Sequence, residues 1–307
     1  MRTPHPLFIG ATLIVVTACG GQHSPTTPSP RFVVGQGGNF ATIGDALKVA
    51  QPDDTIQVRP GTYGERVTIT VSGLKLQGDN AIIDGLAGGL NGTGFGMHLR
   101  GVSDVEVTGF VVQNFEVGIA LENATNCRIH HNETRDNTDK TPPLDFWDGI
   151  RLIASRGNTI SENFSHHNGD NGITLAGGST DNVIRANRLS DNGPQAGIGT
   201  CGIIVIASGN NQNQIVDNEI LRNGWGILFQ PNAASNGNTI RNNQIHDGFR
   251  AGIALRPPAN ASTQNVIEDN DATGNGLANT DPTFAFDLFE GSVGGNTWRR
   301  NNGRANF

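Results

Sequence analysis

The feature that most constrains the fold of this chain is an internal repeat with the pattern Asn-x-Ile-x-x-Asn. Regular copies occupy residues 158–163, 182–187, 213–218, 238–243 and 265–270, and divergent copies read NTWRRN at 296–301 and CRIHHN at 127–132. A second pattern, Gly-Ile-x-apolar, lies between them and begins at Gly118, Gly149, Gly172, Gly202, Gly226 and Gly252. Its spacing varies from 23 to 31 residues, so repeated segments alternate with connections of variable length.

Each repeat contains short stretches in which every second residue is apolar, which is the periodicity of β-strands. One unit cannot bury its apolar face alone, so successive units must stack. The sequence therefore predicts an all-β fold, a right-handed parallel β-helix with three sheets around columns of Ile, Val and Leu. We expect the Asn that closes each motif to adopt the left-handed conformation at a corner and to hydrogen-bond to the Asn of the next coil. Leucine-rich repeats are the competing solenoid, but their Leu-x-x-Leu-x-Leu signature is absent.

The region before the repeats predicts a cap for this stack. Residues 39–50 (NFATIGDALKVA) carry apolar side chains at helical spacing, and Thr42 is a suitable N-cap. A short amphipathic helix there would cover the open first coil and block edge-to-edge association. Residues 67–71, 74–76 and 81–84 are expected to form the first strands.

The N-terminus predicts export. Residues 1–18 combine Arg2 with the apolar stretch 7–16, which is too short to span a membrane and typical of a signal peptide. Val16-Thr17-Ala18-Cys19 resembles a bacterial lipobox, so Cys19 is the predicted lipidation site, although an ordinary signal peptide with an incidental cysteine is the alternative. Residues 19–31 form a Pro/Ser/Thr tether, and residues 32–307 form the β-helix domain. We expect secretion across the inner membrane and anchoring at the outer membrane or cell surface, with the lipid as the only membrane contact.

Charge and cysteine content narrow the possible partners and bonds. The formal net charge is −7 and no basic stripe is present, so nucleic acid is not an expected partner. The repeat places Cys127 and Cys201 three coils apart, roughly 14 Å at the spacing of adjacent strands. That separation exceeds the limit of about 7 Å between the Cα atoms of a disulfide. We expect both to be small buried residues with free thiols.

The segment FATIGDALKVAQPDDTIQVRPGTY, followed by Asn/Gly-rich coils, resembles the pectin-lyase-like β-helix superfamily, including its carbohydrate-binding and sugar-hydrolase group. The resemblance covers roughly residues 32–303 and implies a substrate lying along one parallel sheet, walled by long loops. It does not imply one reaction, because the superfamily includes lyases, epimerases, hydrolases, esterases and non-catalytic proteins.

The strand built from Gly-Ile-x-apolar is the candidate for that substrate sheet. Irregular insertions at residues 133–148, 188–201 and 271–285 lie just before it, although insertions also accumulate wherever a fold tolerates them. Two outward columns follow if the Ile points inward. The first column is His98, Ala120, Arg151, Thr174, Ile204, Leu228, Ala254 and Asp287, and the second begins with Arg100, Glu122, Ile153 and Ala176. Polar and charged groups gather in the N-terminal coils.

These residues provide the predicted site. Asp145, Asp148, Arg151 and His98 are the catalytic candidates, and Arg100, Glu122, Lys140, Trp147 and Asp170 are the substrate-binding candidates. Arginine can bind a uronate carboxylate, an aromatic ring can stack on a sugar, and Asp145 with Asp148 could hold Ca²⁺. Asp145-Phe146-Trp147-Asp148 resembles the Asp-Pro-His-Asp-like segment of alginate epimerases but lacks its Pro and His. A histidine base is therefore in doubt unless His98 or His166 replaces it.

We therefore expect a cell-envelope protein that binds and processes acidic, uronate-containing polysaccharide, as a lyase or C5-epimerase. The alternative is a non-catalytic β-helix that binds a glycan or a periplasmic partner. The pairs His130-His131 and His166-His167 are interpreted as structural, since both precede an Asn corner. No nucleophile elbow, P-loop, His-Glu-x-x-His or Cys-x-x-Cys motif is present.

Overall fold

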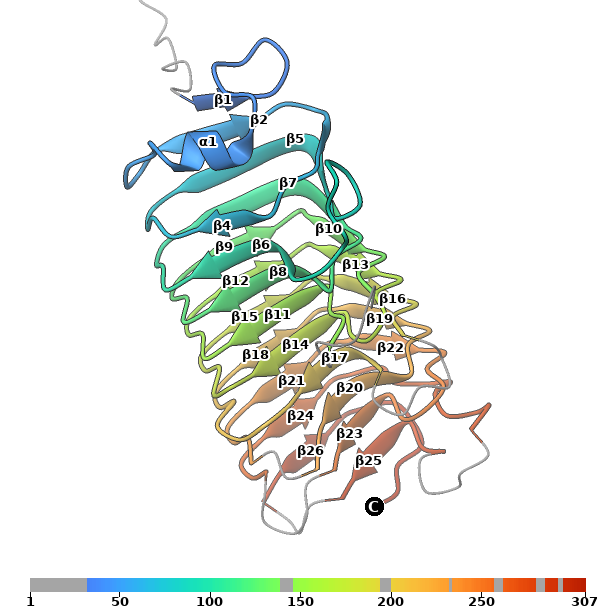
Figure 1. Cartoon of the computed structure of the whole chain (residues 1–307). Helices are drawn as coiled ribbons and strands as arrows, with labels where there is room; N and C mark the ends of the chain where they lie inside the picture. Colours follow the sequence, from blue (N-terminus) through green and yellow to red (C-terminus); the bar gives the residue numbers. More distant parts are fainter. Residues whose placement is uncertain are drawn as a thin grey trace, which may run out of the picture.

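The structure is a computed structural model that describes residues 32–138, 146–193, 200–231, 234–256, 262–279, 285–291 and 295–307. The chain winds as a stack of coils, and each coil contributes strands that pair only with the coils before and after it (Figure 1). All pairings between strands are parallel, as at β8–β11 and β12–β15. The predicted right-handed parallel β-helix is confirmed.

One nine-stranded sheet, which we call sheet B, runs along one side of the stack. Its strands are β4 (Val67–Ile69), β6 (Phe95–Arg100), β8 (Val117–Glu122), β11 (Ile150–Ile153), β14 (Ile173–Ala176), β17 (Cys201–Val205), β20 (Trp225–Phe229), β23 (Ile253–Leu255) and β25 (Leu288–Glu290). They contain the Gly-Ile-x-apolar segments.

The remaining strands form sheet A, which consists of two rows joined at a corner. The first row contains β1 (Phe32–Val34), β2 (Thr55–Val58), β9 (Arg128–His130), β12 (Thr159–Ser161), β15 (Val183–Arg185), β18 (Gln214–Val216), β21 (Thr239–Arg241), β24 (Val266–Glu268) and β26 (Thr297–Arg299). The second row contains β3 (Thr62–Tyr63), β10 (Glu133–Arg135), β13 (Phe164–His166), β16 (Arg188–Ser190), β19 (Glu219–Leu221) and β22 (Gln244–His246). The longer strands β5 (Lys75–Asp84) and β7 (Glu106–Gln113) bend through both rows. With sheet B, the two rows make the three predicted faces.

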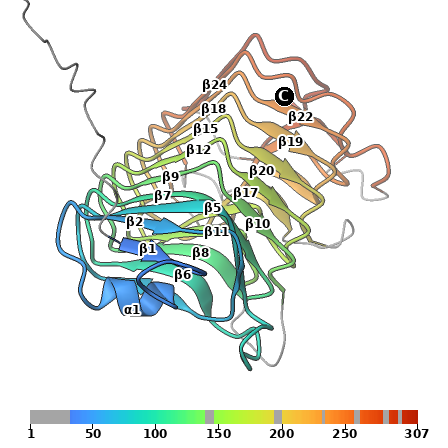
Figure 2. The ribbon, with the colours of Figure 1, turned by 90° about the horizontal axis from the view of Figure 1, so that it is seen from above.

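The core consists of aliphatic columns inside the coils. The Ile of each Asn-x-Ile-x-x-Asn motif is fully buried and stands directly over the Ile of the next coil, as in Ile160 over Ile184 and Ile184 over Ile215. The predicted N-terminal cap is also present, as helix α1 (Ile43–Leu47) beside the first coil (Figure 2). Thr42 caps it by accepting a hydrogen bond from the backbone N of Asp45 at 3.1 Å.

Asparagine side chains form ladders at three corners of the coil, where the sequence predicted one. The first corner carries Asn158, Asn182, Asn213, Asn238, Asn265 and Asn296; the second Asn132, Asn163, Asn187, Asn218, Asn243, Asn270 and Asn301; the third Asn137, Asn168, Asn192, Asn223 and Asn275. At Asn218, Oδ1 accepts from the backbone N and the Nδ2 of Asn187, both at 3.0 Å. Its Nδ2 donates to Asn243 Oδ1 at 2.9 Å and to the carbonyl of Ile184 at 3.0 Å. Every hydrogen-bonding group of such an amide therefore has a partner.

The expectation that the ladder asparagines themselves adopt the left-handed conformation is wrong. That conformation belongs to the residue before each one: at the second corner, His131, Glu162, Ala186, Asp217, Asn242, Asp269 and Arg300 have φ between 52° and 58°. The left-handed residue turns the chain and leaves the following Asn to point inward. Only from inside the corner can its amide reach the carbonyls of neighbouring coils.

Cys127 and Cys201 are buried and free, as predicted. They lie in different layers: Cys127 belongs to the interior core, whereas Cys201 belongs to an apolar cluster with Trp225 and Leu228 on the outer side of sheet B. No helix among the described residues is long and apolar enough to span a membrane.

Candidate functional site

The strand register places the predicted residues on the outer face of sheet B. The first outward column is His98, Ala120, Arg151, Thr174, Ile204, Leu228, Ala254 and Phe289. It matches the predicted column except in the last coil, where Phe289 and not Asp287 faces Ala254. The irregular connection before this coil contains no repeat that could fix its register from the sequence. Asp287 instead turns toward the coil corner, where it accepts a hydrogen bond from the backbone N of Asn275 at 2.7 Å.

Three of the predicted residues form one group at the N-terminal end of this face. His98 Nε2 lies 2.9 Å from Glu122 Oε2, and Arg100 Nε lies 3.8 Å from the same oxygen. Burial lowers the pKa of His98, against the opposing effect of its hydrogen bond to Glu122. The imidazole is therefore held neutral at neutral pH, while the Arg100 side chain remains 68% exposed.

A second group lies further along the same face, around Asp148. This carboxylate is fully buried, with Oδ2 accepting from Arg151 Nη1 at 2.6 Å and Oδ1 accepting from Asn171 Nδ2 at 2.8 Å. The ring of Phe146 covers Arg151, with the guanidinium carbon 3.9 Å from the ring centre. Arg151 belongs to the outward column, as predicted, but only 7% of it is exposed. The residue that covers it belongs to the non-repeating insertion, whose path the repeat does not predict.

Several buried polar atoms in the Asp148 group have no hydrogen-bond partner among the described residues. They are Trp147 Nε1, Arg151 Nε, Asn171 Oδ1 and Thr174 Oγ1. Most buried polar atoms in folded proteins are paired, because leaving one unpaired costs about 1–3 kcal/mol. A local concentration of such atoms marks a place where a bound polar group would find donors and acceptors already positioned.

Asp170 lies beside this group and has the most perturbed carboxyl in it. Its backbone N donates to the carbonyl of Trp147 at 2.8 Å, which holds it under the first insertion. Burial, and then the nearby charge of Asp148, raise the pKa of Asp170 to about 7, while Arg151 and Asn171 act in the opposite direction. Asp170 can therefore exchange a proton near neutral pH, which the sequence did not indicate.

Beyond the Asp148 group the outer face of sheet B becomes apolar. Cys201, Ile204, Trp225, Leu228, Ala251 and Ala254 form a buried cluster. The guanidinium groups of Arg250 and Arg256 lie 5.4 Å and 5.3 Å from the ring centre of Trp225. Burial raises the pKa of the Cys201 thiol, helped by the charges of Asp170 and Asp148, so this cysteine is a neutral packing residue and not a nucleophile.

The structure thus divides the predicted site into two groups on one face. Trp147, Asp148, Arg151 and Asp170 lie together, whereas His98, Arg100 and Glu122 form the other group. His98 and the strand of Thr174 are three strand spacings apart, roughly 14 Å. The two remaining candidates, Lys140 and Asp145, lie outside the described residues.

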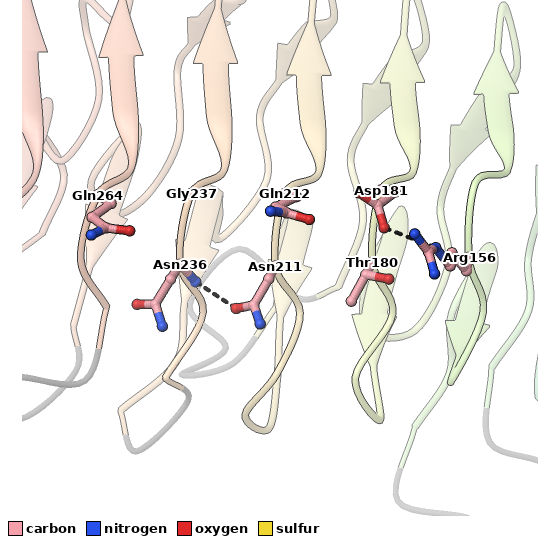
Figure 3. Close-up of a pocket in the computed structure, with 8 residues that line it drawn as sticks. All are labelled: Arg156, Thr180, Asp181, Asn211, Gln212, Asn236, Gly237 and Gln264. Carbon is pink, nitrogen blue, oxygen red and sulfur yellow. Dashed lines mark hydrogen bonds and ion pairs between the residues drawn. The ribbon is translucent and has the colours of Figure 1, made fainter.

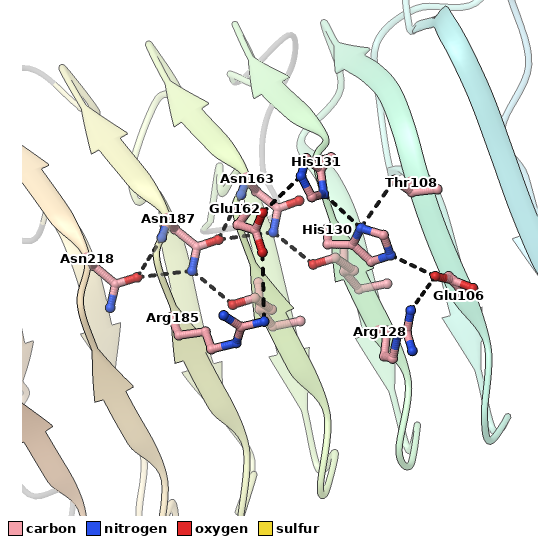
Figure 4. A network of polar contacts seen from close by, with 12 residues as sticks. Glu106, Thr108, Arg128, His130, His131, Glu162, Asn163, Arg185, Asn187 and Asn218 are labelled. Carbon is pink, nitrogen blue, oxygen red and sulfur yellow. Dashed lines mark hydrogen bonds and ion pairs between the residues drawn. The ribbon is translucent and has the colours of Figure 1, made fainter.

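Sheet A carries two open grooves that the repeat pattern alone does not predict. One, of about 360 Å³, crosses successive coils at the first corner and is lined by Arg156, Thr180, Asp181, Asn211, Gln212, Asn236, Gly237 and Gln264 (Figure 3). The other, of about 460 Å³, is lined by Arg128, His130, His131, Thr159, Ser161, Glu162 and Arg185 (Figure 4). For the second groove, the available signal was the polar residues Arg128, His130 and Arg185 at outward positions of β9 and β15.

The family of the chain is decided by comparison with known protein families. The family model described as "Periplasmic copper-binding protein (NosD)" matches residues 54–232. The chain belongs to the NosD family. The matched residues include both groups on sheet B and the whole lining of the second groove, but only part of the lining of the first.

Solved structures similar to this NosD-family chain share its fold at low sequence identity. A mutant of the periplasmic alginate epimerase AlgG matches with a TM-score of 0.57 and 13% identity over 82% of this chain and 60% of that chain. The A-module of the Azotobacter vinelandii mannuronan C-5 epimerase AlgE4 gives 0.53 and 16%, over 84% and 82% of the two chains. XylC in complex with xylose gives 0.59 and 12%, over 85% and 67%. The chain thus spans about 60% of the length of AlgG. Comparison with curated proteins gives no significant match.

The family description names copper, so the described side chains must be compared with the ligands that copper prefers. Copper takes imidazole nitrogen and thiolate sulfur, but the thiols of Cys127 and Cys201, the two cysteines in the described part of the chain, are buried with raised pKa values. Within the described ranges, no three His, Cys, Asp or Glu side chains converge as a complete metal site. The donors that fit in kind are paired histidines on sheet A. For Ca²⁺, Asp148 would have to give up Arg151 and Asn171, which occupy both of its oxygens.

Proposed function

We propose that this protein binds acidic, uronate-containing polysaccharide along the outer face of sheet B and processes it as a lyase or C5-epimerase. The observation that carries the proposal is the Asp148 group, in which a proton-exchanging Asp170 lies beside buried polar atoms without partners in the described structure. Two of the similar structures are alginate and mannuronan epimerases, which supports this substrate class.

Both reactions begin with removal of the proton at C5 of a uronate whose carboxylate is neutralised. A general base is most effective when its pKa lies near the working pH, and Asp170 meets this condition. Arg151, although paired with Asp148, is the cation nearest to Asp170 and would neutralise the carboxylate of the reacting uronate. The exposed Arg100, roughly 14 Å away, would bind the carboxylate of a sugar further along the polymer. The half-buried rings of Phe146 and Trp147 offer apolar area to a sugar face. In this proposal Asp170 is the base and Arg100 a binding residue.

Extracytoplasmic location is part of the proposal. The family is described as periplasmic and so is AlgG, and both descriptions agree with the signal peptide expected at residues 1–18. We further propose that Cys19 is acylated and that residues 19–31 tether the domain to the outer membrane. Residues 1–31 lie outside the described structure. Ca²⁺ held by Asp145 and Asp148 stays a prediction.

A second candidate function is a non-catalytic one, in which the β-helix binds a periplasmic partner. The family match favours it, because that family is described by binding and not by a reaction. The two functions differ in what they require of Asp170: a binding surface for a protein has no need of a carboxyl that titrates near pH 7.

The test is to assay Asp170→Asn against alginate, pectate and glycosaminoglycans, with and without Ca²⁺. Lyase activity would be followed by the ultraviolet absorbance of unsaturated uronate, and epimerase activity by the sugar composition seen by NMR. Loss of a general base should lower turnover by about 10²–10⁴-fold. The matched control is Asp217→Asn, an exposed corner residue with φ 58°, whose activity should equal that of wild type. If wild type neither converts nor binds any of these polymers, the partner-binding function replaces the enzyme.

A further inference from the structure

Four side chains on the outer face of sheet A form a continuous chain of contacts across three coils (Figure 4). Glu106 Oε1 lies 2.8 Å from His130 Nε2, and His131 Nε2 lies 2.9 Å from Glu162 Oε2. Between them, the Nδ1 atoms of His130 and His131 face each other at 2.9 Å. The rings are nearly perpendicular, with an interplanar angle of 83°.

The positions of the protons follow from the partners. An ionised carboxylate can only accept hydrogen bonds, so each Nε2 that contacts Glu106 or Glu162 must carry the hydrogen. In a neutral imidazole the other nitrogen then bears a lone pair. When both rings are neutral, the two Nδ1 atoms present two lone pairs to each other at 2.9 Å, an arrangement that requires a proton or a metal ion between them. The Thr108 hydroxyl, 3.3 Å from His130 Nδ1, can satisfy one lone pair but not both.

We propose that His130 and His131 bind a divalent transition-metal ion of the Cu²⁺ or Zn²⁺ class through their Nδ1 atoms. Imidazole nitrogen is a preferred ligand of both ions. Histidines that bind metals usually donate their other N–H to a carboxylate, which fixes the tautomer and raises the basicity of the ligand. Glu106 and Glu162 supply that contact on both sides. The family description names copper but assigns no residue to it.

The surroundings suit a metal with an incomplete protein shell. The pair lines a groove of about 460 Å³, and the His131 side chain is 60% exposed, so an ion and its water ligands have access. Arg128 contacts Glu106 and Arg185 contacts Glu162, so the two arginines balance the two carboxylates. These four formal charges cancel, so the site does not repel a cation. Water or an anionic ligand would occupy the remaining coordination positions.

Two other histidine positions provide internal comparisons. His166 and His167 repeat the contact, with Nδ1 atoms 2.7 Å apart, but among the residues that the structure describes only His166 has a carboxylate on Nε2, from Glu133 at 3.1 Å. This second pair should bind the same ions more weakly. His246 lies in the same column of the second row as His166 but is followed by Asp247 and not by a second histidine. Its Nδ1 lies 3.0 Å from the carbonyl oxygen of Thr273. It should bind none.

The experiment titrates the metal-free full chain with Cu²⁺ alone and with Zn²⁺ alone, by calorimetry and, for Cu²⁺, by electron paramagnetic resonance. To isolate the first pair, His167→Asn is the background, because Asn tolerates the left-handed conformation of that position (φ 53°). The spectrum should show two nitrogen ligands. Adding His131→Asn, also at φ 53°, should weaken binding by more than about 100-fold, and Glu162→Gln by about 10–100-fold.

His246→Ala is the control and should leave affinity and spectrum unchanged. Circular dichroism establishes that each variant is folded, so a loss of binding reports on the site. The proposal is overturned if the background protein binds neither ion, or if His131→Asn binds as tightly as the background. It is also overturned if NMR shows only a proton shared by the two Nδ1 atoms and no displacement by metal. None of these outcomes depends on polysaccharide activity.

Discussion

The asparagine ladders and the Asp148 group are both buried polar regions, yet they are built in opposite ways. In the ladders the amides are neutral, recur in successive coils and are fully paired, as at Asn218, with one interruption at Gly248 in the third ladder. The Asp148 group is charged, occurs once and contains polar atoms without partners among the described residues. A saturated network stabilises a fold but has no capacity left for a ligand. The comparison indicates that function should be sought where pairing is incomplete.

The largest difference between the two regions should appear when one partner of the buried ion pair is removed. Arg151→Ala leaves Asp148 buried without its cation, and breaking such a pair costs about 3–5 kcal/mol. The matched control is Arg222→Ala, which removes an exposed arginine from Asp191 and should cost no more than about 1 kcal/mol. The free energies of unfolding of both variants should be measured in urea. Equal losses would contradict the burial that distinguishes the Asp148 group.

A somewhat smaller loss is expected when the ladder is broken. Asn218→Ala removes the partners of Asn187 N, Asn187 Nδ2 and the Ile184 carbonyl, so we expect a loss of about 2–4 kcal/mol. Asn302→Ala is the control, because its Nδ2 makes one exposed contact, with Asp271 at 3.2 Å. If the two variants unfold at the same urea concentration, the ladder does not stabilise the stack as described.

The same contrast explains how far the sequence could predict the structure. Repetition made the coils, the core isoleucines and the outward column from His98 to Ala254 predictable, because strand periodicity leaves one register per coil. The third ladder was also predictable in principle, since Asn168 follows Asn163 by the spacing that separates Asn163 from Asn158. The burial of Arg151 was not, because its cover comes from Phe146 in a segment that occurs once. The pKa of Asp170 likewise depends on packing that no repeat encodes.

The smallest expected effect is a gain in the free energy of unfolding when Asp170 is replaced by Asn. A gain is expected only in the Asp148 group, since replacing a ladder asparagine should cause a loss. Because the pKa of Asp170 rises from 3.8 to about 7 on folding, the folded chain holds this proton over a pH range in which the unfolded chain releases it. The group therefore leaves stability unaffected below about pH 4, and stability is lost progressively as pH rises from there to about 7. Between pH 4.5 and 7.5 the loss should be about 2–3 kcal/mol.

Asp170→Asn should remove this dependence of the free energy of unfolding on pH and be more stable than wild type at pH 7.5. Asn218→Ala should keep the wild-type pH dependence and be less stable by the same amount at every pH. Urea unfolding at several pH values measures both. A variant at Asp170 that is destabilised at pH 7.5, or that retains the slope, would show that this carboxyl belongs with the saturated, structural class.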